Sequence, residues 1–294
     1  MDIIEKAAAK AEKTEKVSLV ERAAQSDTDA DRLVLGADGS EAPASKPKRT
    51  SRYAEIDLAG LASQGYITPD SPPNTTAEEF RLIKRSLLLN AFAKGEAAIP
   101  NGNLILVTSS RPNEGKTFGA INLALSIASE QDLTVLLVDA DFAKPEILAK
   151  LGLKGGKGLM DVVSDPDMDL SDCLIRTNIP NLTVLPAGRQ HNRTTEMLAS
   201  DRMEAMMREI ALRYRDRVVI FDSPPALASS VAPVLALHVG QVLFVVEAEK
   251  TTDIQLREAL GLVSACEHTS LMLNKTKFAG GKRYGSYYGY GSAY

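Results

Sequence analysis

Short apolar runs alternate with longer amphipathic segments along the chain from residue 104 onward. The runs are rich in Leu, Val and Ile and have the length of ordinary β-strands. Strands that are apolar throughout are typical of a parallel sheet covered on both faces, because neither face then meets water. The predicted strands are Leu104–Thr108, Thr134–Asp139, Leu182–Leu185, Val218–Phe221, Val242–Glu247 and Leu271–Asn274.

Helical patterns fill most of the gaps between these strands, at Lys116–Glu130, Thr194–Tyr214 and Thr252–Cys266. This alternation predicts an α/β fold with a doubly wound, mainly parallel sheet and helices on both faces. An earlier helix is expected to begin near Thr76–Ala77 and to stop at Gly95, since glycine commonly terminates helices.

Composition divides the chain into four parts. Residues 1–52 combine an Ala-, Glu- and Lys-rich stretch, suited to an exposed helix, with a polar linker that contains Gly and Pro. Residues 53–103 form a lead-in with the helix that begins near Thr76, and residues 104–276 form the α/β domain. Residues 277–294 are a Tyr-rich tail that can bury little surface.

The overall composition narrows the possible functions. Of 294 residues, 44% are apolar and 24% are charged, and a net charge of −4 excludes a chain built mainly as a polycation for nucleic acid. Cys173 and Cys266 are too few for a disulfide framework. No apolar run approaches the roughly 18–20 residues of a membrane-spanning helix, and no signal peptide is visible. We therefore expect a cytoplasmic protein that does not bind nucleic acid and reaches the membrane only through a partner.

A candidate phosphate-binding loop follows the first strand of the α/β domain. Gly115-Lys116-Thr117 opens the next helix, where free backbone N–H groups and the helix dipole favour an anion. Lys116 is expected to contact the β- and γ-phosphates of ATP, and the Thr117 hydroxyl to bind Mg²⁺. Ser110 stands where the usual motif has its first glycine, so a chance match in a surface turn stays open. The residues predicted to bind ATP in this loop are Ser110, Arg111, Pro112, Asn113, Glu114, Gly115, Lys116, Thr117 and Phe118.

Carboxylates end two other buried strands. Asp139 and Asp141 follow the second predicted strand, and Asp222 follows the fourth. The carboxyl ends of parallel strands meet at one edge of a sheet, where doubly wound folds bind ligands. Each carboxylate could instead cap the following helix. Three such carboxylates beside one phosphate loop together favour a site for Mg²⁺ and a nucleotide.

Five of the eight tyrosines lie in the last part of the chain, separated by Gly, Ser and Ala. They are Tyr284, Tyr287, Tyr288, Tyr290 and Tyr294. Such a segment suits a substrate that must reach an active site, and each phosphate would add about −1.5 to −2 charges to it. A tail with no chemical role is the alternative interpretation.

These residues resemble the bacterial tyrosine kinases of exopolysaccharide loci. The resemblance covers roughly residues 77–294 and rests on SSRPNEGKT, VLLVDADFAKP, VVIFDSPP, LPAGR with TEMLAS, and the terminal tyrosines. The branch that looks most similar is the autokinases of exosortase (PEP-CTERM) polysaccharide systems. The resemblance implies a P-loop NTPase-like fold in which Lys116 and Thr117 hold ATP and Mg²⁺. Asp141 and Asp222 then organise the metal, and Asp139 assists.

The resemblance also implies partners. Tail tyrosines are expected to take phosphate from a neighbouring subunit of a homo-oligomer, which in related kinases is a ring. Glu78, Arg81 and Lys84 match the oligomer contact of that ring, with Lys replacing the last Arg. Asn274 stands where related folds contact adenine, although a plain strand-end turn is equally consistent. A membrane activator related to chain-length regulators and a tyrosine phosphatase complete the expected partners.

Two other functions stay open from the sequence. A spatial-regulation ATPase, of the septum-positioning or plasmid-partition kind, shares the fold but usually has an additional lysine where this chain has Arg111, Pro112 and Asn113. It also lacks a terminal tyrosine cluster. A nucleotide-gated scaffold would bind ATP and control polymer export without kinase activity.

Overall fold

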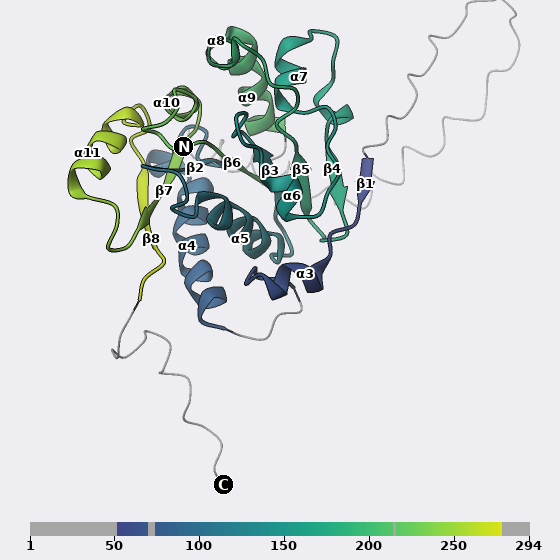
Figure 1. The fold of residues 1–294 in the computed structure, drawn as a ribbon. Helices are drawn as coiled ribbons and strands as arrows, with labels where there is room; N and C mark the ends of the chain where they lie inside the picture. The colour runs from purple at the N-terminus through teal and green to yellow at the C-terminus, as the bar shows by residue number, and fades with distance from the viewer. Residues whose placement is uncertain (1–51, 70–73, 214–215, 278–294) are drawn as a thin grey trace, which may run out of the picture. The chain divides into compact units, whose positions relative to one another are not determined.

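A mainly parallel sheet of eight strands organises the residues that the computed structural model describes, 52–69, 74–213 and 216–277 (Figure 1). The strand order is β1-β4-β5-β3-β6-β2-β7-β8, and each neighbouring pair is parallel except β4 and β5. The α/β fold predicted from the apolar pattern is therefore confirmed. The strands are β1 (Arg52–Ala54), β2 (Leu104–Ser109), β3 (Thr134–Asp139), β4 (Ile175–Thr177), β5 (Leu182–Leu185), β6 (Arg217–Asp222), β7 (Gln241–Glu247) and β8 (Thr269–Asn274).

Helices cover both faces of the sheet, each over its own hydrophobic core. One core packs α3 (Leu58–Ser63), α4 (Thr75–Ala91), α5 (Lys116–Ala128) and α6 (Ile147–Lys150) against the strands. The other packs α7 (Leu159–Ser164), α8 (Thr194–Leu198), α9 (Asp201–Arg213), α10 (Val231–Ala236) and α11 (Asp253–Leu262). Short 3-10 helices lie at Gly95–Ala97 and Leu170–Asp172.

The predicted elements of the α/β domain match the observed ones, with small differences at their ends. The single helix predicted at Thr194–Tyr214 is two helices, because the chain turns at Ala199 and Ser200. Helix α4 ends at Ala91, before the predicted stop at Gly95. The N-terminal helix and linker predicted over 1–52 fall almost wholly outside the described residues, as do the five tail tyrosines.

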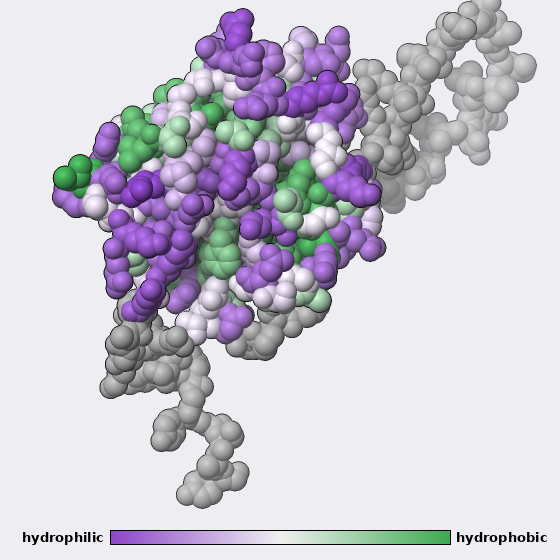
Figure 2. Space-filling model, viewed as in Figure 1, coloured by the Kyte–Doolittle hydropathy of each residue, from purple (hydrophilic) through white to green (hydrophobic). Residues whose placement is uncertain are grey.

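Within the described residues, no helix is both long and apolar enough to cross a bilayer. The face shown in Figure 2 is mostly hydrophilic, with a hydrophobic patch over α11. The described part of the chain therefore offers no membrane-spanning helix.

Candidate active site

The phosphate loop connects β2 to α5 at the carboxyl edge of the sheet. Gly115 precedes α5 with φ of 99°, a left-handed conformation that glycine adopts without strain. A Cβ atom at this position would lie 2.0 Å from Nδ2 of Asn274, so a larger residue here would be strained by its φ and would also displace that amide. No side chain caps the start of α5, which leaves its first N–H groups for an anion. This geometry is compatible with the predicted phosphate-binding loop.

Lys116 and two strand-end carboxylates meet beside this loop. The Lys116 ammonium lies 3.1 Å from Oδ2 of Asp141, and both side chains are largely buried. The Asp139 carboxylate accepts hydrogen bonds from the backbone N–H groups of Asp141, at 3.3 Å, and Ile147, at 3.1 Å. Asp139 therefore holds the loop after β3 and caps α6, as the alternative interpretation of this residue expected. Burial and the Asp222 charge raise the pKa of Asp139 to about 7, against the opposing effect of these two hydrogen bonds.

Asp222 lies directly across from Asp139 in the paired strands β6 and β3. Only 1% of its surface is exposed, and burial raises the pKa of its carboxyl to about 7, although the Lys116 charge and the nearby Thr117 hydroxyl oppose the shift. Neither carboxylate oxygen of Asp222 has a hydrogen-bond partner, and the same is true of the buried Ser110 hydroxyl. Among the described residues, these three atoms are the only buried side-chain oxygens or nitrogens without a partner. Such groups are costly unless a ligand or an ordered water satisfies them.

The residues present fit Mg²⁺. Thr117, Asp141 and Asp222 offer only oxygen donors, which this ion prefers. Within residues 52–69, 74–213 and 216–277, no three His, Cys, Asp or Glu side chains form a ready-made metal cluster. Mg²⁺ commonly takes one or two carboxylates and completes its shell with substrate phosphates and water. This donor set is therefore adequate for an ion that arrives with a nucleotide.

The sequence did not reveal that Glu114 ties the phosphate loop to a second loop. Its side chain is buried, and one carboxylate oxygen accepts from the Arg111 N–H at 2.9 Å. The other accepts from the Thr251 hydroxyl, which follows β7. The carboxylate of Glu114 therefore holds the loop in shape from inside.

The end of β8 also clamps this loop. The Asn274 amide donates to the Glu114 carbonyl at 2.8 Å, and the Lys275 ammonium donates to the Asn113 carbonyl at 2.5 Å. Lys275 is paired in turn with Glu247, at 3.3 Å. Asn274 thus lies at the predicted nucleotide site, with its amide engaged by the loop backbone.

The remaining loop residues divide into two groups. Arg111, Pro112 and Asn113 are exposed at the mouth of the loop. Phe118 turns the other way, with its ring centroid 5.1 Å from that of Tyr66 and 6.4 Å from that of Phe80. Phe118 therefore attaches the start of α5 to the lead-in segment and α4.

We expect Thr251→Val to weaken nucleotide binding about three- to tenfold, because losing one hydrogen bond of about 1 kcal/mol to a carboxylate frees the loop. Thr251→Ser keeps the hydroxyl and serves as the matched control. Titration with a fluorescent ATP analogue measures the change, and thermal unfolding checks that both variants fold. Equal affinity of the Val and Ser variants would show that the Glu114 contact does not shape the loop.

The predicted oligomer contacts lie on α4 and differ from one another. Glu78 and Arg81 form an exposed ion pair on the helix surface. Lys84 is buried instead: its ammonium donates to the Ser126 carbonyl at 3.1 Å and pairs with Glu130. Lys84 therefore fastens α4 to α5 within its own chain, a role that the motif match did not predict.

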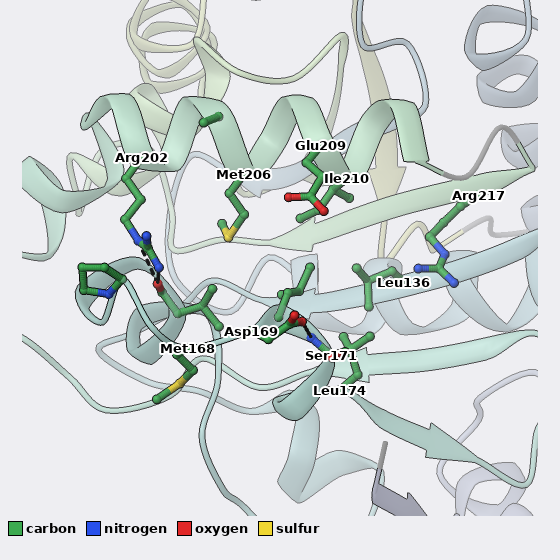
Figure 3. A pocket seen from close by; sticks show the side chains of 14 residues that line it. Leu136, Met168, Asp169, Ser171, Leu174, Arg202, Met206, Glu209, Ile210 and Arg217 are labelled. Carbon is green, nitrogen blue, oxygen red and sulfur yellow. Dashed lines mark hydrogen bonds between the residues drawn. The ribbon is translucent and has the colours of Figure 1, made fainter. Parts of the chain in front are cut away.

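A cavity of about 340 Å³ lies away from this site, under α9 (Figure 3). Met206 and Ile210 of α9 face Met168 and Leu174 across it, while Arg202 donates to the Val162 carbonyl at 2.7 Å. Arg217, the first residue of β6, also lines it, whereas Asp222 is the last residue of that strand. No residue of the phosphate loop and none of the three strand-end carboxylates lines this cavity. The two carboxyl groups whose pKa values are raised to about 7, Asp139 and Asp222, lie beside the phosphate loop and not at this cavity.

Comparison with known proteins gives a consistent picture. A family model described as an AAA domain matches residues 102–264. The putative tyrosine-protein kinase CapB of Staphylococcus aureus is 29% identical over 222 residues, which cover 75% of this chain and 93% of CapB. The putative tyrosine-protein kinase EpsB of Ralstonia nicotianae is 30% identical over 235 residues, which cover 76% of this chain but only 30% of EpsB. The solved kinase domain of the Escherichia coli tyrosine kinase ETK has a TM-score of 0.60 and 25% identity, and the match covers 80% of this chain and 95% of that domain.

Proposed function

Since the chain belongs to the bacterial tyrosine kinase family, we propose that it transfers the γ-phosphate of ATP to tyrosines in the tail of a neighbouring subunit. The acceptors are the five tyrosines at 284, 287, 288, 290 and 294. The activity regulates exopolysaccharide synthesis or export. The chain acts on the cytoplasmic side, where a chain-length-regulator-type activator holds it at the membrane and a tyrosine phosphatase reverses the modification. Membership of the exosortase-associated branch is tested by none of the relatives compared and stays a prediction.

The buried unpartnered oxygens of Ser110 and Asp222, beside the Lys116–Asp141 pair, carry this proposal. They give the site buried polar groups that a bound ligand can satisfy. Mg²⁺, when bound, would neutralise negative charge on the phosphates of the nucleotide. Thr117, Asp141 and Asp222 would hold it.

The other residues position the reactants. The N–H groups at the start of α5 and the Lys116 ammonium bind the phosphates and stabilise the charge that develops on them. An acceptor tyrosine has an ordinary pKa of about 10 and is protonated at neutral pH, so a carboxylate helps to orient or accept its proton. Asp139 and Asp141 are the candidates. The pKa of Asp139, raised to about 7, suits a group that exchanges protons near neutral pH.

A mixing experiment tests transfer between subunits. A Lys116→Met protein that keeps its tail is incubated with an active protein lacking residues 284–294, ATP and Mg²⁺, and the tail is mapped by mass spectrometry. We expect phosphate on the tail of the inactive partner. A clean tail on that partner, with both proteins folded, would contradict transfer between subunits. If the full-length wild type also leaves its own tail clean, a nucleotide-gated scaffold or a spatial-regulation ATPase is favoured.

The exposed face of α4 is the proposed contact between subunits. Leu82 and Leu89 are 66% and 69% exposed and lie about two helical turns apart, on the face that also carries Glu78. We expect Glu78→Ala with Arg81→Ala to reduce the oligomer in sedimentation and to slow transfer several-fold, with stability unchanged because the pair is exposed. Removing the exposed Glu204–Arg208 pair of α9 by alanine is the matched control. If both double variants sediment as the wild type does, the α4 face is not the contact.

A further inference from the structure

Strand β8 is an open edge of the sheet in the described part of the chain. The His268 and Asn274 carbonyls accept from the Val242 and Ala248 N–H groups, each at 2.9 Å. Backbone groups of successive residues in a strand point to opposite sides. The N–H and C=O groups of Leu271 and Leu273 therefore point away from β7, to the open side.

The same two residues expose apolar side chains. Leu271 is 56% exposed and Leu273 is 60% exposed, whereas Met272 between them is buried in the core on the other face. An edge strand with unpaired backbone groups and exposed leucines is a template for another strand. Native proteins normally cover or charge such an edge, and β8 has no charged residue (TSLMLN).

The chain itself supplies a segment for this edge. The described residues end at Lys277, only three positions after β8, and 17 residues (278–294) follow. Gly280-Gly281 is suited to a reversal of the chain. Because the segment is covalently attached, its effective concentration at β8 is far higher than that of a second copy in dilute solution.

The tail has the alternation that a covering strand needs. In an extended strand, residues two apart share a face, so Tyr284, Tyr288 and Tyr290 would lie on one side. Gly285 and Gly289 would lie on the other side, with Tyr287. Pairs of an aromatic and an aliphatic side chain across two strands stabilise a sheet.

We propose that residues 282–290 of the tail add to β8 as an antiparallel strand, with the tyrosines at even-numbered positions covering Leu271 and Leu273. This docked state withholds those tyrosines from any active site, a consequence that rests on the proposed role of the tail as phosphate acceptor. A phosphate on any of them would place a charge of about −1.5 to −2 against the leucines, so a modified tail stays released.

Hydrogen exchange of the backbone amides tests the docking without kinase activity. In a Lys116→Met protein, the Leu271 and Leu273 amides are compared between the full chain and a chain that ends at Lys277. We expect exchange about tenfold faster without the tail, as for a local opening equilibrium. Equal exchange in the two proteins would overturn the proposal, and so would protection that grows with protein concentration, which would indicate a second copy.

Matched tail variants locate the contact. Replacing Tyr284, Tyr288 and Tyr290 with serine should abolish the protection, whereas Tyr287→Ser, on the opposite side, should preserve it. Equal effects of the two changes would contradict the proposed alternation. If the mixing experiment fails while the exchange result holds, transfer between subunits is wrong and the docked strand remains.

Discussion

Replacing Lys116 with methionine is expected to reduce tail phosphorylation by about 10²–10³-fold, the usual effect of removing one charge-stabilising donor from a transition state. Methionine keeps much of the aliphatic stem and removes the ammonium. The side chain lies 3.1 Å from Asp141 and is 12% exposed, so the charge that is lost stands at the centre of the site. Its loss also removes the main effect that lowers the pKa of Asp222, so this carboxyl becomes harder to ionise for a metal.

Incubation with labelled ATP and Mg²⁺, followed by mass mapping of the tail, measures this effect. Circular dichroism and thermal unfolding check that the variant folds, and Lys116→Arg is the control that keeps the charge. Wild-type phosphorylation of a folded Lys116→Met protein would remove Lys116 from the mechanism.

The sequence was sufficient for the parts of the fold that depend on local pattern. All the strands predicted from apolar runs exist. Strands β2, β3, β6 and β7 are buried on both faces and must therefore be apolar almost throughout, whereas β8 was found by the same pattern although Leu271 and Leu273 are exposed. The phosphate loop and the strand-end carboxylates lie together, since the carboxyl ends of β2, β3 and β6 meet at one edge. The short strands β1 and β4 carry too few residues for a detectable period.

Contacts between distant residues were outside the reach of the sequence. Lys84 pairs with Glu130 across 46 positions, and Glu114 accepts from Thr251 across 137 positions. No repeating pattern in the sequence marks either pair. The first pair forms because α4 packs on α5, and the second because the phosphate loop packs against the segment that follows β7. Glu114 lies within the loop whose residues were all predicted from the sequence to bind ATP. Only the burial of its side chain shows that its carboxylate is bonded within the protein.

Asp222→Asn is expected to abolish most activity and yet to stabilise the protein without ligand. Asparagine has nearly the shape of aspartate but no charge, so the metal loses a carboxylate ligand. In the absence of ligand, burial disfavours the ionised carboxylate more than the Lys116 charge and the Thr117 hydroxyl favour it, so the charge costs free energy in the folded state. Removing the charge should therefore raise the free energy of unfolding by about 1–3 kcal/mol at pH 8. Asp253→Asn, at an exposed aspartate whose pKa is lowered by its hydrogen bond to Arg257, is the control and should not stabilise.

The effect of Asp222→Asn on stability should depend on pH. The pKa of Asp222 is about 7 in the folded state and 3.8 as the ordinary value, so the folded state binds more protons between these limits. The free energy of unfolding of the wild type should then fall as the pH rises through this window and level off above it. Asp222→Asn should flatten the curve, also because the Asp222 charge helps to raise the pKa of Asp139. Without ligand, the wild type and the Asn variant should therefore have similar free energies of unfolding at pH 4 and differ most at pH 8, where the Asn variant is the more stable. Saturating Mg²⁺ and ATP should reverse this order at pH 8, because they stabilise only the wild type. Chemical denaturation at both pH values, with and without ligand, measures all four cases. An Asn variant less stable than the wild type at pH 8 without ligand would show that Asp222 is not held as an unsatisfied anion.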